Sequence, residues 1–117
     1  MIKILKETSA DLLAIRIEGK VTGADFETLN PVLEKVIEGQ KAPAAYIELL
    51  EPEKVTLGAV MEDLMNVPKY SKFRKIAIVA EKKWQDMAAN FWGALMNTEI
   101  RYFAFEEKSI AMEWLGK

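Results

Sequence analysis

The segment from Phe73 to Trp84 constrains the fold of this chain more than any other. It reads FRKIAIVAEKKW, so an apolar run over residues 76–80 passes directly into charged residues and then a tryptophan. An apolar run of four to eight residues without polar alternation indicates a strand buried on both faces, as in parallel α/β sheets. We therefore predict a parallel sheet covered by helices. The segment fixes an architecture and carries no catalytic motif.

Apolar periodicity predicts the other elements. Leu13, Ile15 and Ile17 alternate with smaller or polar residues, which predicts a strand with one buried face, paired with an N-terminal strand. Thr22 and Asp25 have the spacing of a helix start, in which a hydroxyl and a carboxylate cap free backbone amides. The predicted strands are 2–5, 12–18, 45–50, 76–80 and 100–105, and the predicted helices are 22–39, 56–67, 84–97 and 110–115.

These elements follow the order ββαβαβαβα. Consecutive strand–helix–strand units imply parallel pairs joined by right-handed crossovers. We predict an α/β fold with a mixed five-stranded sheet, in which the N-terminal strand is antiparallel and the remaining strands are parallel, and about four helices. Pro31 lies inside the first helix, where we expect a kink or a restart. The 117 residues contain no linker or repeat, so we expect residues 1–117 to form a single domain.

The absence of two residue types limits the reactions and the metal sites that this chain can support. The chain has no cysteine and no histidine, which removes thiolate nucleophiles, the usual general base and the commonest transition-metal ligands. We expect no catalytic residues, no metal site and no cofactor. The formal charge of −2 gives no reason to expect nucleic acid. No apolar run is long enough for a membrane span and the N-terminus lacks a secretory signal, so we expect a cytoplasmic protein.

Several short segments lie in order along nearly the whole chain, at 19–22, 58–64, 74–79, 82–84, 99–103, Ala111 and 114–115. In these segments the chain resembles the bacterial SpoIIAA-like group, which is related to the STAS domains of anti-sigma-factor antagonists and sulfate transporters. The resemblance implies a mixed sheet with an antiparallel N-terminal strand, and a role in binding other proteins. The group is also compared with CRAL-TRIO lipid-transfer domains, which implies an apolar ligand as an alternative.

The resemblance also points to one candidate switch position. Anti-sigma-factor antagonists carry an Asp-Ser-Ser-Gly-like motif where the loop after the third strand enters the next helix, and a kinase phosphorylates one of its serines. Here the segment is Val55-Thr56-Leu57-Gly58, which keeps the glycine and one hydroxyl but lacks the aspartate. We interpret Thr56 and Gly58 as a vestigial phospho-switch. We expect Thr56 to cap its helix, and we expect no phosphate on it.

Basic residues concentrate around the fourth predicted strand. Aromatic residues lie among them, which superficially resembles a nucleic-acid patch. We interpret the aromatics as packing the loop onto the core and the lysines as solubilising it, with an anionic partner surface as the alternative. The residues are Lys69, Tyr70, Lys72, Phe73, Arg74, Lys75, Lys82 and Lys83.

The third predicted helix is apolar over an unusually wide arc. Trp92 and Met96 lie roughly 80 and 120 degrees from the stripe that contains Trp84, Phe91 and Leu95. Extra core explains such a flank, and so does an interface or an apolar-ligand surface. We expect at least one of the two to be covered by a partner or a second copy.

The leading functional hypothesis is a non-catalytic STAS-type protein-interaction or regulatory module that forms a homodimer or binds another protein. The alternative is a small carrier or sensor of a lipid or other apolar ligand, and an enzyme of unknown type comes third.

Overall fold

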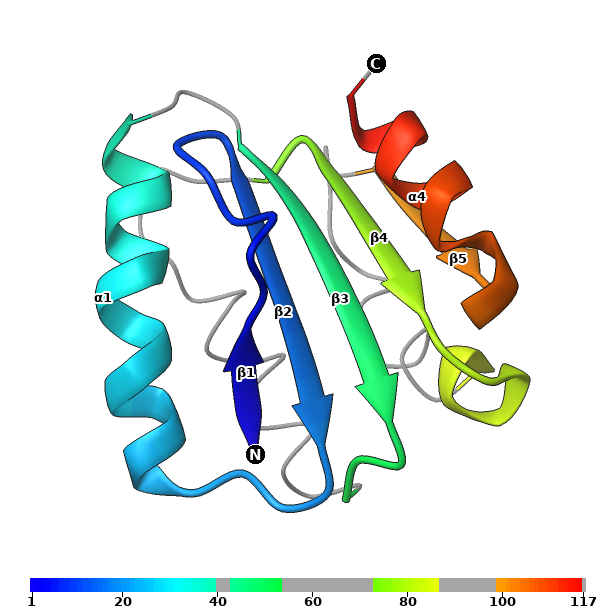
Figure 1. The fold of residues 1–117 in the computed structure, drawn as a ribbon, viewed down its shortest axis with the longest axis horizontal. Helices are drawn as coiled ribbons and strands as arrows, with labels where there is room; N and C mark the ends of the chain where they lie inside the picture. Colours follow the sequence, from blue (N-terminus) through cyan, green and yellow to red (C-terminus); the bar gives the residue numbers. More distant parts are fainter. Residues whose placement is uncertain (40–42, 54–72, 87–98, 117) are drawn as a thin grey trace.

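The computed structural model describes residues 1–39, 43–53, 73–86 and 99–116. Five strands form one sheet in which the spatial order follows the chain order (Figure 1). The first pair is antiparallel and the other three pairs are parallel, so the predicted mixed sheet is confirmed. The strands are β1 (Ile2–Ile4), β2 (Leu12–Glu18), β3 (Ala44–Leu50), β4 (Lys75–Val79) and β5 (Glu99–Phe103).

Helices flank the sheet. The described part of the chain contains α1 (Gly23–Gly39), a helical segment at 82–86, a 3₁₀ turn at Phe105–Glu107 and α4 (Lys108–Leu115). The helix predicted from Thr56 lies outside the described residues. Helix α1 runs through Pro31 as one helix, so the expected restart is wrong. Pro31 deprives the Glu27 carbonyl of its intrahelical donor, but both residues are exposed and water can replace the lost bond.

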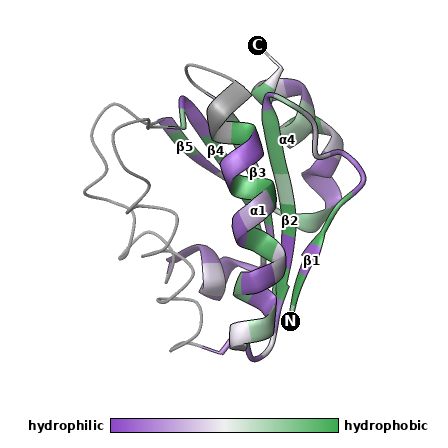
Figure 2. Ribbon diagram, turned by 90° about the vertical axis from the view of Figure 1, so that its left-hand side faces the viewer, coloured by the Kyte–Doolittle hydropathy of each residue, from purple (hydrophilic) through white to green (hydrophobic). Residues whose placement is uncertain are grey.

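The two faces of the sheet pack against different helices (Figure 2). Because side chains alternate along a strand, Ile76 and Ile78 of β4 point into the core shared with α1, while Ala77 and Val79 point into the core shared with α4. All four are buried, which confirms a strand covered on both faces. On the face toward α4, small side chains pack in one cluster with two large aromatic residues, Phe103 and Trp114. The centroids of these two rings are 6.0 Å apart.

Two cations at the start of β4, Arg74 just before the strand and Lys75 as its first residue, bind the C-terminus of α4. Arg74 donates a 2.8 Å hydrogen bond to the Leu115 carbonyl and the Lys75 ammonium one of 3.1 Å to the Trp114 carbonyl. The Lys75 nitrogen also lies 4.9 Å from the Trp114 ring centroid. The last carbonyls of a helix lack backbone donors and carry partial negative charge, so these cations satisfy them. Two of the clustered basic residues therefore have a structural role.

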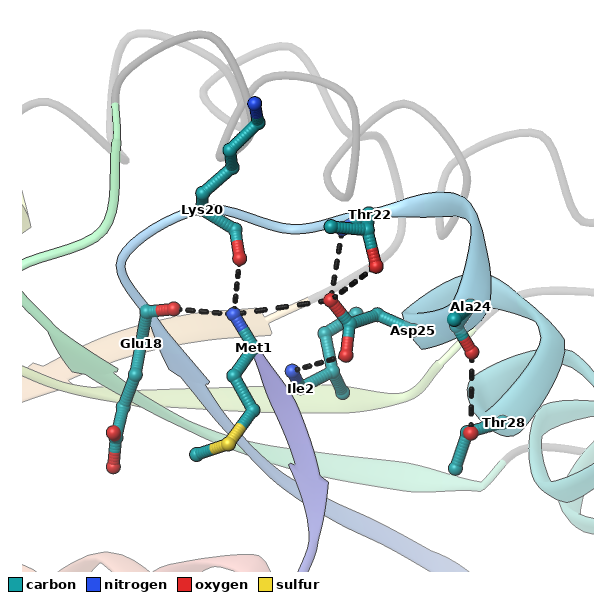
Figure 3. Close-up of polar contacts among 8 residues, drawn as sticks. All are labelled: Met1, Ile2, Glu18, Lys20, Thr22, Ala24, Asp25 and Thr28. Carbon is teal, nitrogen blue, oxygen red and sulfur yellow. Dashed lines mark hydrogen bonds and ion pairs between the residues drawn. The ribbon is translucent and has the colours of Figure 1, made fainter.

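One carboxylate joins the start of α1 to β1 (Figure 3). Asp25 accepts hydrogen bonds from the backbone N–H groups of Thr22, at 2.8 Å, and Ile2, at 3.1 Å. The Met1 ammonium lies 3.8 Å away and also donates to the Glu18 and Lys20 carbonyls. The predicted capping carboxylate is confirmed. The predicted hydroxyl cap is wrong, because the Thr22 hydroxyl donates to Asp25 instead.

Candidate functional site: a charged groove beside α4

Helix α4 covers only part of its face of the sheet. It packs on β3 and β4, and Figure 1 shows it away from β1 and β2. A helix is about 10 Å wide, whereas five strands spaced about 4.8 Å apart span roughly 19 Å. Among the described residues, no second helix packs on the β1–β2 part of this face. Charged residues lie there in register, with Lys3 of β1 opposite Arg16 of β2, and Arg16 opposite Glu48 of β3.

Glu48 is the centre of this surface. Glu48 is only 4% exposed, and it is the one charged residue that is buried among the described residues. One carboxylate oxygen accepts a 2.9 Å hydrogen bond from Arg16 Nε. The other accepts a 2.6 Å bond from the Tyr46 hydroxyl and lies 3.6 Å from Lys108 Nζ. Tyr46 and Glu48 meet because residues two apart on a strand share a face.

The surroundings keep Glu48 ionised. Burial raises the pKa of its carboxyl, but hydrogen bonds from Tyr46 and Arg16, with the charges of Lys108 and Arg16, outweigh burial and lower the pKa below its ordinary value. Burial, and then the hydrogen bond to Glu48, raise the pKa of Tyr46. The Glu48 hydrogen bond raises the pKa of Arg16. A general acid or base works best with a pKa near the operating pH, so Glu48 is suited to organising the surface rather than to transferring protons.

An open groove of about 830 Å³ lies over this network. Its volume is in the range of small-molecule sites, roughly 300–1,000 Å³. Four cationic side chains and two carboxylates line it, which leaves a net of two positive charges. The lining residues are Lys3, Ile4, Leu5, Lys6, Glu7, Arg16, Tyr46, Glu48, Lys108, Ser109 and Met112.

A second hollow lies where β2, β3 and β4 end. It has a volume of about 690 Å³ and its acidic lining residues are Glu18, Glu51 and Glu81. Gly19 and Glu51 both have positive φ, at 52° and 43°, so the chain turns sharply after each strand. Within the described ranges no acidic group has the arrangement of a metal site. We therefore interpret this hollow as a result of the sharp turns at the strand ends rather than as a metal site. It lies next to the segment that leads toward Thr56 in the sequence.

The residues proposed from the sequence as sites all fall outside the described ranges. Thr56 and Gly58 lie in 54–72, and Trp92 and Met96 lie in 87–98. Their roles stay predictions. Sequence reasoning missed the Arg16–Glu48 pair, although a single glutamate inside the apolar strand AYIELL was a usable signal, because buried charges are paired.

Comparison with known proteins agrees with this architecture. The family model described as SpoIIAA-like matches residues 12–116. A crystal structure of an uncharacterized protein of the DUF3478 family with a SpoIIAA-like fold, from Shewanella loihica PV-4, is 28% identical with a TM-score of 0.69. The match covers 97% of this chain and 93% of that chain.

No curated protein matches the chain. In the described part of the chain, no helix has the length and apolar character of a membrane span. The family model and the structural neighbour lead to the same conclusion, and the predicted resemblance is confirmed. The chain belongs to the SpoIIAA-like family.

Proposed function

We propose that residues 1–117 act as a single-domain, non-catalytic interaction module of the STAS type in the cytoplasm, which binds a partner protein or a second copy of itself. The observation that carries this proposal is the open, charged part of the sheet beside α4. Its one buried carboxylate is already paired with the charges of Arg16 and Lys108 and accepts a hydrogen bond from the Tyr46 hydroxyl. Such a surface presents fixed charges on a rigid sheet and offers binding without a poised proton donor or acceptor.

The described hollows favour this function over a carrier of an apolar molecule. A carrier needs an enclosed apolar cavity, because it must remove most of its ligand from water. The groove and the strand-end hollow are both open, and charged residues line both. Family membership supports the same role.

Native mass spectrometry of the purified protein tests the proposal, because it reports oligomeric state and bound small molecules together. We expect a homodimer, or a monomer that captures a protein partner, without a retained ligand. A stoichiometric apolar molecule that survives desalting would instead support the carrier. Turnover of a substrate by the purified protein, lost on substitution of one residue, would contradict a non-catalytic module.

A further inference from the structure

The groove beside α4 is more cationic than the protein that contains it. The whole chain has 16 basic and 18 acidic residues. In the groove the balance is reversed, with Lys3, Lys6, Arg16 and Lys108 against Glu7 and Glu48. Charges gathered in a concave surface raise the local concentration of counter-ions more than the same charges scattered over a convex one.

The four cations differ in their availability. Arg16 is engaged by Glu48 at 2.9 Å and by Glu18 at 3.7 Å. Lys108 lies 3.6 Å from Glu48, but its side chain is 45% exposed. Lys3 and Lys6 form no ion pair with any described residue, and both are exposed. The groove therefore places two unpaired ammonium groups beside a third that is only partly neutralised.

The cations come from separate elements that the fold holds in place. Lys3 is on β1 and directly opposite Arg16 of β2, Lys6 follows β1, and Lys108 begins α4. The Glu48 network links α4 to β2 and β3, because Lys108, Arg16 and Tyr46 all contact one carboxylate. The backbone positions that carry the positive groups are thus set by the fold before an anion arrives, which lowers the entropic cost of gathering them around it.

Part of the lining is apolar. Leu5, on the segment after β1, and Met112, on α4, are half-buried and also pack against the α4 core. Ligand sites combine apolar walls with a few placed polar groups. We propose that the groove binds a small amphiphilic organic anion, with its carboxylate or phosphate among Lys3, Lys6 and Lys108 and its short apolar part along Leu5 and Met112. This site shares its surface with the proposed interaction role, but anion binding requires neither a partner protein nor a second copy.

NMR titration of the full chain tests the site. The probes are octanoate and octyl phosphate below their micelle-forming concentrations, with acetate, inorganic phosphate and 1-octanol as matched controls. We expect saturable shift changes confined to β1, residues 5–7 and the first turn of α4, with a shift of the Met112 methyl. Whichever of octanoate and octyl phosphate binds more tightly identifies the preferred headgroup, carboxylate or phosphate. Binding should weaken as salt is added, because exposed charges are screened.

Two double variants separate local contacts from overall charge. Lys3→Gln with Lys6→Gln should weaken binding roughly tenfold, the loss expected when about 1.4 kcal/mol of binding free energy is removed. Lys20→Gln with Lys82→Gln changes the net charge equally at exposed positions away from the groove and should leave affinity within about twofold. All four lysines are exposed, so both variants should fold.

Three results would overturn the proposal. The first is an equal loss of binding in both double variants, which would show only long-range attraction. The second is binding of 1-octanol or acetate as tight as that of octanoate, which would remove the need for an amphiphilic anion. The third is a shift pattern that leaves β1 and α4 unchanged. A failure of this titration together with a homodimer in native mass spectrometry would leave the interaction module intact.

Discussion

Arg16 and Glu48 face each other across the neighbouring parallel strands β2 and β3, with 2.9 Å between Nε and Oε1. The contact joins residues 32 positions apart in the sequence. Parallel strands have no connecting turn to set their register, so a charged pair between them favours one alignment. A shift of either strand by two residues would separate the pair and leave the buried Glu48 without a cation, which is costly.

Glu48→Gln should lower the free energy of unfolding by roughly 1–3 kcal/mol, because Arg16 and Lys108 lose a charged acceptor on a buried surface. Urea denaturation at neutral pH measures the change. Glu34→Gln, on the exposed face of α1, is the matched control and should have almost no effect. Equal stability of the two variants would mean that the network contributes nothing to folding.

Glu48→Gln should also change how the free energy of unfolding depends on pH in the acid range. The folded-state pKa of Glu48 lies below its ordinary value of 4.5, so its contribution is present above that value and is lost as the pH falls. Wild-type stability should therefore decline as the pH falls below 4.5 and on through the lowered pKa of Glu48. The decline should be shallower in Glu48→Gln. A residual slope should remain, because hydrogen bonds from Thr22, and then from Ile2, also lower the pKa of Asp25.

Tyr46→Phe should change how the free energy of unfolding depends on pH in the alkaline range. Burial and the bond to Glu48 raise the pKa of Tyr46, so the folded chain keeps the phenolic proton where the unfolded chain, with a pKa of 10.0, loses it. Wild-type stability should fall as the pH rises above that value. The phenylalanine variant should cost about 0.5–1.5 kcal/mol at neutral pH and show less of this alkaline loss. Parallel alkaline slopes in both proteins would contradict the assignment.

Asp25→Asn should lower the free energy of unfolding by roughly 0.5–2 kcal/mol, because the carboxylate caps α1 and binds the β1 backbone. Asp86→Asn makes the same chemical change at an exposed pair, where Asp86 lies 3.7 Å from Lys82. That control should change stability by less than about 0.5 kcal/mol. Thermal and urea denaturation of both variants measure the difference, and similar losses would argue against a special role for Asp25.

Trp92→Glu tests the self-association that the wide apolar arc of the third predicted helix suggests. If Trp92 lies in an interface, the variant should stay folded and become monomeric in size-exclusion chromatography with light scattering. Trp92→Phe keeps the apolar character and should remain associated. Unfolding of Trp92→Glu would instead place Trp92 in the core, because burying an unpaired charge is strongly destabilising.

The sheet could be predicted because each strand carries its own apolar pattern and strand–helix alternation determines parallel pairing. The groove could not, because it depends on register and on where α4 packs. One signal for the α4 face was present. Ala14 and Ala77 alternate with large aliphatic residues, and these small side chains leave room for the aromatic residues on that face. Glu48 was visible as a charge inside an apolar strand, whereas its partners Arg16 and Lys108 become neighbours only in the folded sheet.

The strand order β1-β2-β3-β4-β5 has a consequence for synthesis on the ribosome. Each of these five strands emerges after its neighbour and can add to the open edge of the growing sheet, so none of the five has to be inserted between two others. Long-range parallel pairing is normally slow, and unpaired edges promote aggregation while the chain waits. Helix α4 follows all five of these strands in the sequence, and it covers the Tyr46, Val79 and Phe103 side chains. A chain stalled before residue 108 would thus display that apolar surface, which makes α4 the segment whose arrival ends the exposed stage of folding.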